Sequence, residues 1–433
     1  MKSGLSDLIM RGVLIQLLAI GLLSSSSSLA NEGHLALVGA TIIDGTSAAP
    51  IENGVLVISD GRVRSIGPAS DVSIPDGAQI IEVNGKTVIP GLINAHGHVG
   101  NTIGLESGEY NRANLLRQLG LYARYGVTTV FSLGGDAEQG FALRDEQEHA
   151  DLNRARLFVA GDVITGNSEE QIRQRVNGVA DLGADYVKVR VDDNLGRTPK
   201  MPRPLFEALV DQAHTRRLPV AVHLFYLEDA RHALRAGADL IAHSVRDQPV
   251  DQDFISQLRE QEVCYIPTLT REVSTFVYED VPDFFADPFF RKEVGDDIIA
   301  QLSEPERMGR MAASSSAQAY KAGLEVAMDN VGILNRAGIS VAMGTDTGPP
   351  ARFQGYFEHM ELDLMVQSGM TPLDAIRSAT GVAASCMGRS DIGTLEPGNW
   401  GDFVVLGANP TVDIANTKTV ESVWIAGNRV PQD

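Results

Sequence analysis

The stretch Thr87-Val88-Ile89-Pro90-Gly91-Leu92-Ile93-Asn94-Ala95-His96-Gly97-His98 decides the fold. Its apolar residues predict a buried strand over residues 87–95, and two histidines follow at its end. Side chains at i and i+2 of a strand point to the same face, so His96 and His98 can share one metal ion, with Gly97 leaving room between them. An isolated His-x-His pair is weak evidence, but it is much stronger at the C-terminal end of a barrel strand, where (β/α)8 barrels build their active sites.

Strand-like and helix-like segments alternate along the chain with the spacing of parallel βα units. Helical patterns cover residues 113–125, 204–217 and 227–236, and each runs into Gly or Pro near its end. The predicted strands are residues 87–95, 127–133, 156–162, 186–191, 219–225, 239–244, 263–269 and 339–345. Eight such strands predict an α/β fold in which residues 89–390 form a (β/α)8 TIM-type barrel.

Residues 282–321 are predicted to form a helical insertion between the seventh and eighth strands. The segment is longer than a usual connection and contains the aromatic run Phe284-Phe285-Ala286-Asp287-Pro288-Phe289-Phe290. Three interpretations remain open: a lid over the barrel mouth, a contact between subunits, and an outer decoration of the barrel.

Short β-branched runs broken by turn residues flank the barrel on both sides. They cover residues 35–46 and 54–67 near the beginning, and 401–406 and 420–430 near the end. Neither set has enough strands to bury a core alone. We therefore expect residues 31–88 and 391–433 to combine into one small β-sandwich domain.

The first 30 residues have the pattern of a secretory signal peptide. Lys2 and Arg11 precede the apolar run 12–23, and a serine tract closes on Ser28-Leu29-Ala30, with small residues at the positions that the peptidase reads. The apolar run is shorter than the roughly 20 residues of a membrane-spanning helix. We expect an exported protein, periplasmic or secreted, without stable membrane insertion after cleavage.

Charge and cysteine content restrict the partners and the redox state. The formal net charge is −20 at pH 7, which repels phosphate backbones and argues against nucleic acid, so a small-molecule substrate is the expected partner. The two cysteines, Cys264 and Cys386, are far apart in sequence and have no metal-binding spacing. An oxidising compartment would permit a disulfide, but we expect buried free thiols.

Lys188 lies on a predicted strand whose valines alternate with charged residues, Tyr186-Val187-Lys188-Val189-Arg190-Val191. The valines should face the helices, so Lys188 and Arg190 should face the barrel interior. A buried lysine beside metal ions tends to lose its proton, and the neutral amine can react with CO2 to give a carbamate that bridges two cations. The alternative is an ion pair of Lys188 with Asp192 or Asp193.

Three more candidate ligands stand at the ends of predicted strands. His223 ends the fifth strand, His243 ends the sixth, and Asp346 follows the eighth in Gly344-Thr345-Asp346. Taken singly, each has a structural interpretation, as a hydrogen-bonded histidine or, for Asp346, a helix N-cap. Their shared position at one rim favours a metal site.

These motifs together resemble the amidohydrolase superfamily. Within it they resemble the imidazolonepropionase-like branch, which includes Xaa-Pro and Xaa-Arg dipeptidases and ochratoxin-type amidases. The resemblance covers nearly the whole chain after residue 30, and it is specific for the superfamily but much less so for the substrate. It rests on Gly39-Ala40-Thr41-Ile42-Ile43-Asp44-Gly45, the Pro-Gly-Leu-Ile-Asn-Ala-His-Gly-His strand, Gly344-Thr345-Asp346, the segment 369–376, and the closing segment 393–402.

The resemblance implies a binuclear site with two divalent ions. His96, His98 and Asp346 would bind one ion, His223 and His243 the other, and a carbamate on Lys188 would bridge both. Zinc is the favoured metal for such mixed ligands. A metal-activated hydroxide would attack the substrate, and Asp346 would carry the proton to the leaving amine. The expected enzyme is a hydrolase that cleaves an amide or peptide-like C–N bond of a small substrate, such as a dipeptide or N-acyl amino acid.

Substrate contacts and alternative functions are less constrained. Arg190, two residues beyond Lys188, is a candidate for binding a substrate carboxylate, with a structural ion pair to Asp192 or Asp193 as the alternative. Tyr226, just after the fifth strand, is a second candidate contact. The alternative functions are a mononuclear cyclic-amide hydrolase or deaminase of the imidazolonepropionase type, and lactone or phosphotriester hydrolysis at the same binuclear site. The sequence leaves open whether the protein forms a homo-oligomer.

Overall fold

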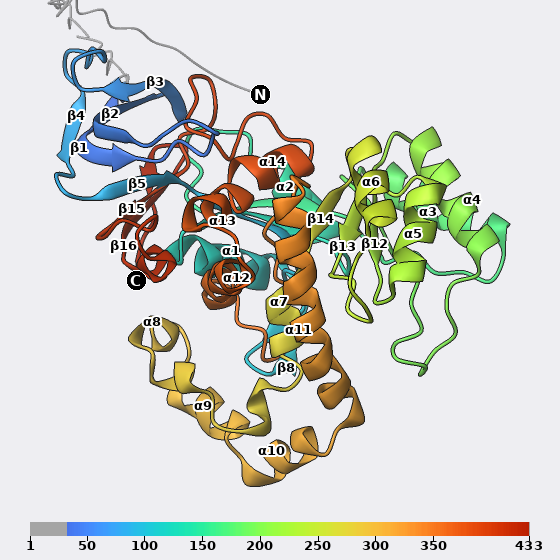
Figure 1. The fold of residues 1–433 in the computed structure, drawn as a ribbon. Coiled ribbons are helices and arrows are strands. Elements are labelled where there is room, and N and C mark those ends of the chain that lie inside the picture. Colours follow the sequence, from blue (N-terminus) through green and yellow to red (C-terminus); the bar gives the residue numbers. More distant parts are fainter. Residues whose placement is uncertain (1–32, 433) are drawn as a thin grey trace, which may run out of the picture. The chain divides into compact units, whose positions relative to one another are not determined.

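Both ends of the described chain contribute strands to one sheet. The computed structural model describes residues 33–432, and the predicted signal peptide, residues 1–30, lies outside them. In Figure 1 the blue strands from the N-terminal part lie beside the red strands from the C-terminal part. The strands are β1 (Leu35–Ile42), β2 (Ile51–Ser59), β3 (Arg62–Pro68), β4 (Gln79–Glu82), β5 (Thr87–Pro90), β15 (Phe403–Leu406), β16 (Val420–Ile425) and β17 (Asn428–Arg429). Their order is β17-β16-β15-β5-β1-β2-β3, and β4 pairs with β1.

The pairing of β5 with β15 joins the two ends of the chain. These strands are antiparallel, and β5 also pairs in parallel with β1. Alternation along the strands gives the sheet two apolar faces, since Leu37 and Leu56 belong to one buried cluster and Ala36 and Val55 to another. Strand pairing connects all of these strands into a single sheet, so the predicted β-sandwich stays a prediction.

Seven further strands form two parallel sheets, with the orders β10-β9-β6 and β11-β12-β13-β14. Each of the seven overlaps one of the predicted barrel strands. They are β6 (Leu92–Gly97), β9 (Val127–Ser132), β10 (Arg156–Val159), β11 (Val187–Arg190), β12 (Val220–His223), β13 (Leu240–Ala242) and β14 (Cys264–Ile266). An isolated parallel bridge between Ile164 and Val189 connects the two sheets after β10.

The first predicted strand, residues 87–95, is divided between two sheets. Its first part is β5, in the sheet of the chain ends, and its second part is β6, in the parallel sheet. Gly91 stands between them, where a Cβ atom would lie 2.0 Å from Oγ1 of Thr128. The backbone passes its neighbour too closely for any side chain, so glycine is required at this bend.

The eighth predicted strand, residues 339–345, does not form a regular strand. Val341 makes an isolated bridge with Tyr265 of β14, and Thr347 makes one with Gly97 of β6. Asp346 has a φ of 57°, outside the extended region. The segment therefore contacts a strand on each side, but its backbone turns away before a continuous ladder can form.

Helices separate the parallel strands along the chain. They are α1 (Arg112–Arg124), α2 (Glu138–Asp145), α3 (Glu169–Asp181), α4 (Arg203–Thr215), α5 (Leu227–Ala236), α6 (Gln252–Glu260), α7 (Leu269–Val273), α12 (Tyr356–Gln367), α13 (Pro372–Ser378) and α14 (Gly381–Cys386). The predicted helix 227–236 coincides with α5, which buries Leu227, Ala230 and Leu234 and ends at Gly237 in the left-handed conformation. Short elements include the hairpin β7 (Thr102–Ile103) and β8 (Glu106–Ser107), with η1 (Val277–Glu279) and η3 (Ile414–Lys418). Among residues 33–432, no helix is long and apolar enough to cross a bilayer.

The insertion is helical and packs through its aromatic residues. It contains η2 (Asp283–Ala286), α8 (Pro288–Arg291), α9 (Asp296–Leu302), α10 (Pro305–Ala312) and the start of the long helix α11 (Ser315–Arg336). Phe285 and Phe290 share a buried cluster with Tyr125 and Tyr356, and Figure 1 shows α11 running beside α7 and α12. The aromatic run thus anchors the insertion to the ends of α1 and α12.

The prediction of two free thiols was wrong, because Cys264 and Cys386 form a disulfide. Cys264 begins β14 and Cys386 ends α14, and their Cα atoms lie 5.7 Å apart although 122 positions separate them in sequence. The sequence gives no sign of this proximity, because only the return of the chain after the eighth segment brings α14 next to β14.

We expect the disulfide to stabilise the fold by restricting the unfolded chain. Replacing both cysteines by serine should lower the free energy of unfolding by about 2–4 kcal/mol, measured by urea denaturation. A reductant should destabilise the parent protein and leave the double serine variant unchanged, which is the control. Two reactive thiols in the natively folded, unreduced parent would contradict the pairing.

Candidate active site

The predicted metal ligands gather at the C-terminal ends of the parallel strands. His96 lies at the end of β6, Lys188 lies within β11, and His223 ends β12. His243 follows β13, and Asp346 follows the irregular eighth segment. Because these strands are parallel, their ends meet at one side of the sheets, as the sequence predicted.

Asp346 lies against the two histidines of the His-x-His motif. Its Oδ1 atom is 2.8 Å from Nε2 of His98 and 3.6 Å from Nε2 of His96. His96 is fully buried, whereas His98 is partly exposed. One carboxylate oxygen and two imidazole nitrogens thus converge, as ligands of a shared cation would.

Lys188 is buried at the centre of this group. Its Nζ atom lies 3.3 Å from Nε2 of His96, and it makes no ion pair within 4 Å with a described carboxylate, including Asp192 and Asp193. Burial lowers the pKa of Lys188 to about 7, although the negative charges of Asp346 and Asp192 act in the opposite direction. A substantial fraction of the amine is therefore neutral near pH 7.

His223 and His243 complete the ring of imidazoles. The ring centroid of His243 is 4.2 Å from that of His223 and 4.6 Å from that of His96. Nε2 of His223 lies 3.2 Å from Oδ2 of Asp192, a neighbour that the sequence did not assign to the site. Burial lowers the pKa of His223 to about 3 despite this carboxylate, so the ring is neutral, the form that binds metal ions.

Backbone and hydroxyl groups fix the orientation of two of these rings. Nδ1 of His98 lies 2.9 Å from the carbonyl oxygen of Gly134, and Nδ1 of His243 lies 2.6 Å from Oγ1 of Thr268. In each ring the contact engages one nitrogen and leaves the other for a ligand, the usual arrangement around metal-binding histidines.

The side chains present fit a metal ion. Ligand atoms of His96, His243 and Asp346 all lie within 4.8 Å of one another. Nε2 of His223 is buried and makes no well-aligned hydrogen bond among the described residues, although Oδ2 of Asp192 lies 3.2 Å away, and an unsatisfied polar atom of this kind is costly in a protein interior. A bound cation would give such an atom a partner. The candidate ligands are imidazole nitrogens and a carboxylate, a combination that suits zinc.

The backbone is strained where the strands enter the site. His243, Thr268 and Asp346 have φ values of 96°, 50° and 57°, although residues with side chains disfavour this region. Such strain persists only where surrounding contacts hold it, and it concentrates at functional sites. Gly348 also has a positive φ, and a Cβ atom there would lie 2.1 Å from the carbonyl oxygen of His98, so the position requires glycine.

The two predicted substrate contacts point to neighbouring acids. Nε of Arg190 donates a 2.8 Å hydrogen bond to Asp192, and the hydroxyl of Tyr226 donates a 2.9 Å bond to Asp193. The ammonium of Lys200 lies over the Tyr226 ring. Arg190 thus has the ion pair that its alternative interpretation expected, and Tyr226 has an acidic partner as well. Contact of either residue with a substrate stays a prediction.

Sequence reasoning missed two arginines that face Asp346. Nη1 of Arg352 forms an ion pair with Oδ2 of Asp346, and Nε of Arg271 lies 3.9 Å from the same oxygen. Arg271 follows β14 in the run Pro267-Thr268-Leu269-Thr270-Arg271-Glu272. Arginine after a strand end is common in sequences, so only the folded loops identify these two as part of the site.

Helix α12 supports the site with two buried acidic residues that the sequence analysis also missed. Glu358 accepts hydrogen bonds from Asn94, Thr345 and Thr347, each at 2.7 Å. Glu361, one turn later, accepts bonds from the backbone amides of Leu269 and Thr270, both at 2.7 Å, and burial raises its pKa to about 8. The first acid ties β6 to the Asp346 segment, and the second holds the loop that carries Thr268 and Arg271.

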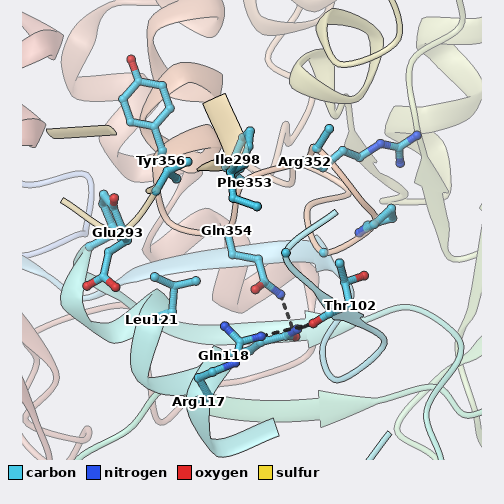
Figure 2. A pocket seen from close by; sticks show the side chains of 16 residues that line it. Thr102, Arg117, Gln118, Leu121, Glu293, Ile298, Arg352, Phe353, Gln354 and Tyr356 are labelled. Atoms are coloured by element: carbon cyan, nitrogen blue, oxygen red, sulfur yellow. Dashed lines mark hydrogen bonds between the residues drawn. The ribbon is translucent and has the colours of Figure 1, made fainter. Parts of the chain in front are cut away.

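A cavity of about 150 Å³ lies beside the Asp346 segment. Figure 2 shows its walls, which come from α1, the insertion and the segment 348–356. Gln354 donates a 3.0 Å hydrogen bond to Gln118, which in turn donates to the carbonyl oxygen of Thr102. Arg352 is one of the residues that line the cavity, and its guanidinium group pairs with Asp346. The cavity is therefore separated from the candidate metal ligands by a single residue.

Parallel strands that alternate with helices, with candidate ligands at their C-terminal ends, are typical of α/β enzymes of the TIM-barrel class. The model of the Amidohydrolase family matches residues 87–430. The chain belongs to the amidohydrolase family, as its motifs predicted.

Known proteins resemble the chain over most of its length. Ochratoxinase of Aspergillus niger is 23% identical over 454 residues, which cover 92% of this chain and 87% of the relative. Imidazolonepropionase of Streptomyces griseus is 23% identical over 418 residues, which cover 89% and 95%. The solved structure of a Xaa-Pro dipeptidase with bound methionine in the active site has a TM-score of 0.73 at 21% identity, covering 92% of this chain and 99% of that one. The predicted enzyme class is confirmed: the protein is a hydrolase that acts on carbon–nitrogen bonds.

Replacing Glu358 by glutamine should weaken the site without removing a ligand. The new amide group would face the hydroxyl and amide donors that now bond to the carboxylate, leaving buried donors unpaired. We expect the free energy of unfolding to fall by about 1–3 kcal/mol and zinc affinity to fall about 10- to 100-fold, measured by urea denaturation and chelator competition. Glu325→Gln, at an exposed position of α11, is the control. Unchanged zinc affinity in Glu358→Gln would contradict the positioning role.

Proposed function

We propose that the protein is a binuclear zinc amidohydrolase that cleaves an amide or peptide-like bond of a dipeptide or N-acyl amino acid. The environment of Lys188 carries this proposal. Its amine is buried 3.3 Å from His96 and is partly neutral near pH 7. A neutral amine reacts with CO2 to give a carbamate, with a new N–C bond and release of one proton. The product is an anion with two oxygens, suited to bridging two cations.

The surrounding residues would divide between two ions. His96, His98 and Asp346 would hold one, and His223 and His243 the other, with the Lys188 carbamate between them. The convergence of Asp346 on His96 and His98, and the close rings of His223 and His243, support this division. When bound, zinc would lower the pKa of a water molecule and polarise the scissile carbonyl.

Asp346 would move the proton. Its Oδ1 faces the histidines and its Oδ2 faces the arginines, so the carboxylate stands between the candidate metal ligands and the two guanidinium groups. Burial acts to raise the pKa of Asp346, but Arg352 and His98 hold it well below its usual range. The group is therefore ionised before reaction, ready to accept a proton from water and return it to the leaving nitrogen.

Two observations favour the alternative of a mononuclear site. Ligand atoms of His96, His243 and Asp346 all lie within 4.8 Å of one another, and one relative is an imidazolonepropionase. A mononuclear cyclic-amide hydrolase or deaminase would need only such a set, with Lys188 unmodified. Lactone or phosphotriester hydrolysis at a binuclear site stays an alternative from the sequence alone.

We also infer that the parallel strands close into a (β/α)8 barrel. In support, ladders connect β6 to β10 and β11 to β14, the Ile164–Val189 bridge joins these sheets, and the 341–347 segment bridges β14 to β6. This cyclic order returns to its first strand. A closed barrel would place the candidate ligands in a single ring around its mouth.

Export is a further part of the proposal. Disulfides persist mainly in oxidising compartments outside the cytoplasm, so the Cys264–Cys386 bond supports the signal peptide predicted over residues 1–30. If the full chain is expressed in a bacterium with a secretion pathway, the exported protein should begin at Asn31. N-terminal sequencing of the purified protein tests this, and a product that retains Met1 would contradict cleavage.

Metal content is the first test of the binuclear site. Protein produced with zinc and bicarbonate should contain about two zinc ions per chain, and Lys188→Ala should lose most of this metal together with amide hydrolysis, because the bridging ligand is gone. Elemental analysis gives the metal content, and a panel of dipeptides and N-acyl amino acids gives the activity. Lys86→Ala, which removes a lysine paired with Glu421, is the matched control.

One zinc ion in both the parent and Lys188→Ala would overturn the carbamate bridge. That result would direct the substrate search to cyclic amides and deamination. Two zinc ions with hydrolysis of lactones alone would retain the site and reject the amide substrate.

A further inference from the structure

Three guanidinium groups lie close together beside the candidate metal ligands. Arg246 follows β13, Arg271 lies on α7, and Arg352 belongs to the segment after Asp346. Two carboxylates face them, Glu272 and Asp346. Arg246 and Arg271 are almost fully buried, as is Glu272, and Arg352 is partly buried. Charges in such an environment need close partners.

Glu272 is already neutralised by Arg246. Nη1 of Arg246 forms an ion pair with Glu272, and Nη2 donates a 2.5 Å hydrogen bond to the carbonyl oxygen of Leu224. Arg271 also contacts Glu272, at 3.1 Å. One negative charge thus serves two arginines on this side, and the balance of Arg271 and Arg352 depends on Asp346.

Asp346 cannot serve both arginines and the metal site. Under the proposed function its Oδ1 binds metal and the carboxylate carries the proton, so its negative charge is committed to the cations of the site. Nε of Arg271 is buried without a hydrogen-bond partner among residues 33–432, and it faces Oδ2 of Asp346 from 3.9 Å. The three guanidinium groups therefore carry more positive charge than Glu272 alone can balance once Asp346 binds the cations.

We infer that Arg271 and Arg352 bind the free carboxylate of the substrate. The inference rests on the proposed amide hydrolysis and specifies which end of the substrate lies beside Asp346. A guanidinium group matches the planar, two-oxygen geometry of a carboxylate and binds it through two hydrogen bonds. The substrate class is an N-acyl amino acid or a dipeptide, whose carboxylate lies one carbon away from the scissile nitrogen.

Two further observations favour these arginines over Arg190. Arg190 and Arg271 each have one buried nitrogen without a hydrogen-bond partner among the described residues, but their carboxylate neighbours differ. Arg190 is paired with Asp192, which the proposed metal site does not use, whereas Arg271 and Arg352 face Asp346, whose charge the cations would take. Arg352 is also one of the residues that line the cavity of Figure 2, which has a volume of about 150 Å³. Tyr320, on α11 of the insertion, accepts a 3.2 Å hydrogen bond from Arg271 and lies under its guanidinium plane. The insertion thereby fixes the orientation of one anion-binding group.

Matched substrates that differ only in charge provide the test. For the dipeptide or N-acyl amino acid that the zinc-loaded protein hydrolyses best, kcat/KM is compared with that of the same compound carrying a terminal carboxamide. The parent should prefer the carboxylate at least about tenfold, because buried hydrogen bonds to a charged group are involved. Arg271→Met and Arg352→Met should each remove most of this preference, chiefly through KM.

Controls separate recognition from a general loss of function. Arg271→Lys and Arg352→Lys keep the charge and should retain part of the preference, and Arg310→Met, on the exposed surface of α10, should retain all of it. A parent without preference, or methionine variants that lose both substrates equally, would overturn the inference, since the arginines would then serve only to hold Asp346.

Binding of compounds that contain no amide bond keeps the test independent of catalysis. We would titrate the zinc-loaded protein with leucine, phenylalanine and arginine, and with 3-methylbutylamine, 2-phenylethylamine and agmatine, which lack the carboxylate. At least one amino acid should bind about tenfold more tightly than its amine, and Arg271→Met should abolish the difference. If no amide is hydrolysed, the proposed function fails while this comparison still decides the carboxylate site. Equal binding within every pair would overturn it.

Discussion

The position of the Asp346 carboxylate is the constraint on which the site depends. Its two oxygens separate two groups of positive or metal-binding side chains, with His96 and His98 on one side and Arg271 and Arg352 on the other. This requires an unfavourable backbone conformation at Asp346, whose amide donates a 2.6 Å hydrogen bond to the carbonyl oxygen of His96. Local strain at this residue is therefore coupled directly to the His-x-His strand.

The support for that conformation comes from outside the ligand set. Glu358 of α12 bonds to Asn94 of β6 and to the two threonines on either side of Asp346, so a single buried carboxylate fixes the first and last segments of the barrel relative to each other. Glu361 does the same for the loop after β14, which carries the hydroxyl that orients His243 and the guanidinium of Arg271. One helix thus positions both the candidate metal ligands and Arg271 of the proposed carboxylate site.

Sequence reasoning could predict that the candidate ligands lie near one another because strand geometry determines their positions. Period-two alternation places Lys188 inward, and strand ends place His96, His223 and His243 at one rim, so short-range patterns were sufficient. Contacts between loops were beyond reach, because the pairing of Arg271 and Arg352 with Asp346, like the Cys264–Cys386 bond, depends on where distant segments return. The eighth strand was predicted as regular because its apolar run does not reveal that the backbone leaves the extended conformation at Asp346, where φ is 57° and only isolated bridges form on either side.

The candidate ligands and the residues around the neighbouring cavity stand on different kinds of element. The candidate ligands stand on strands or directly after them, where the backbone ladders limit movement. Arg271 instead stands on the short helix α7 and Arg352 on a loop, and the walls of the neighbouring cavity come from α1, the insertion and the segment 348–356. A barrel can retain its hydrolytic groups while the loops change which substrate they accept. The insertion supplies Tyr320 to Arg271 and Val294 and Ile298 to the cavity, and its aromatic residues fasten it to α1 and α12. The insertion takes no part in the ladders of the parallel strands, so its links to the site are the contact of Tyr320 with Arg271 and the residues that it adds to the cavity wall.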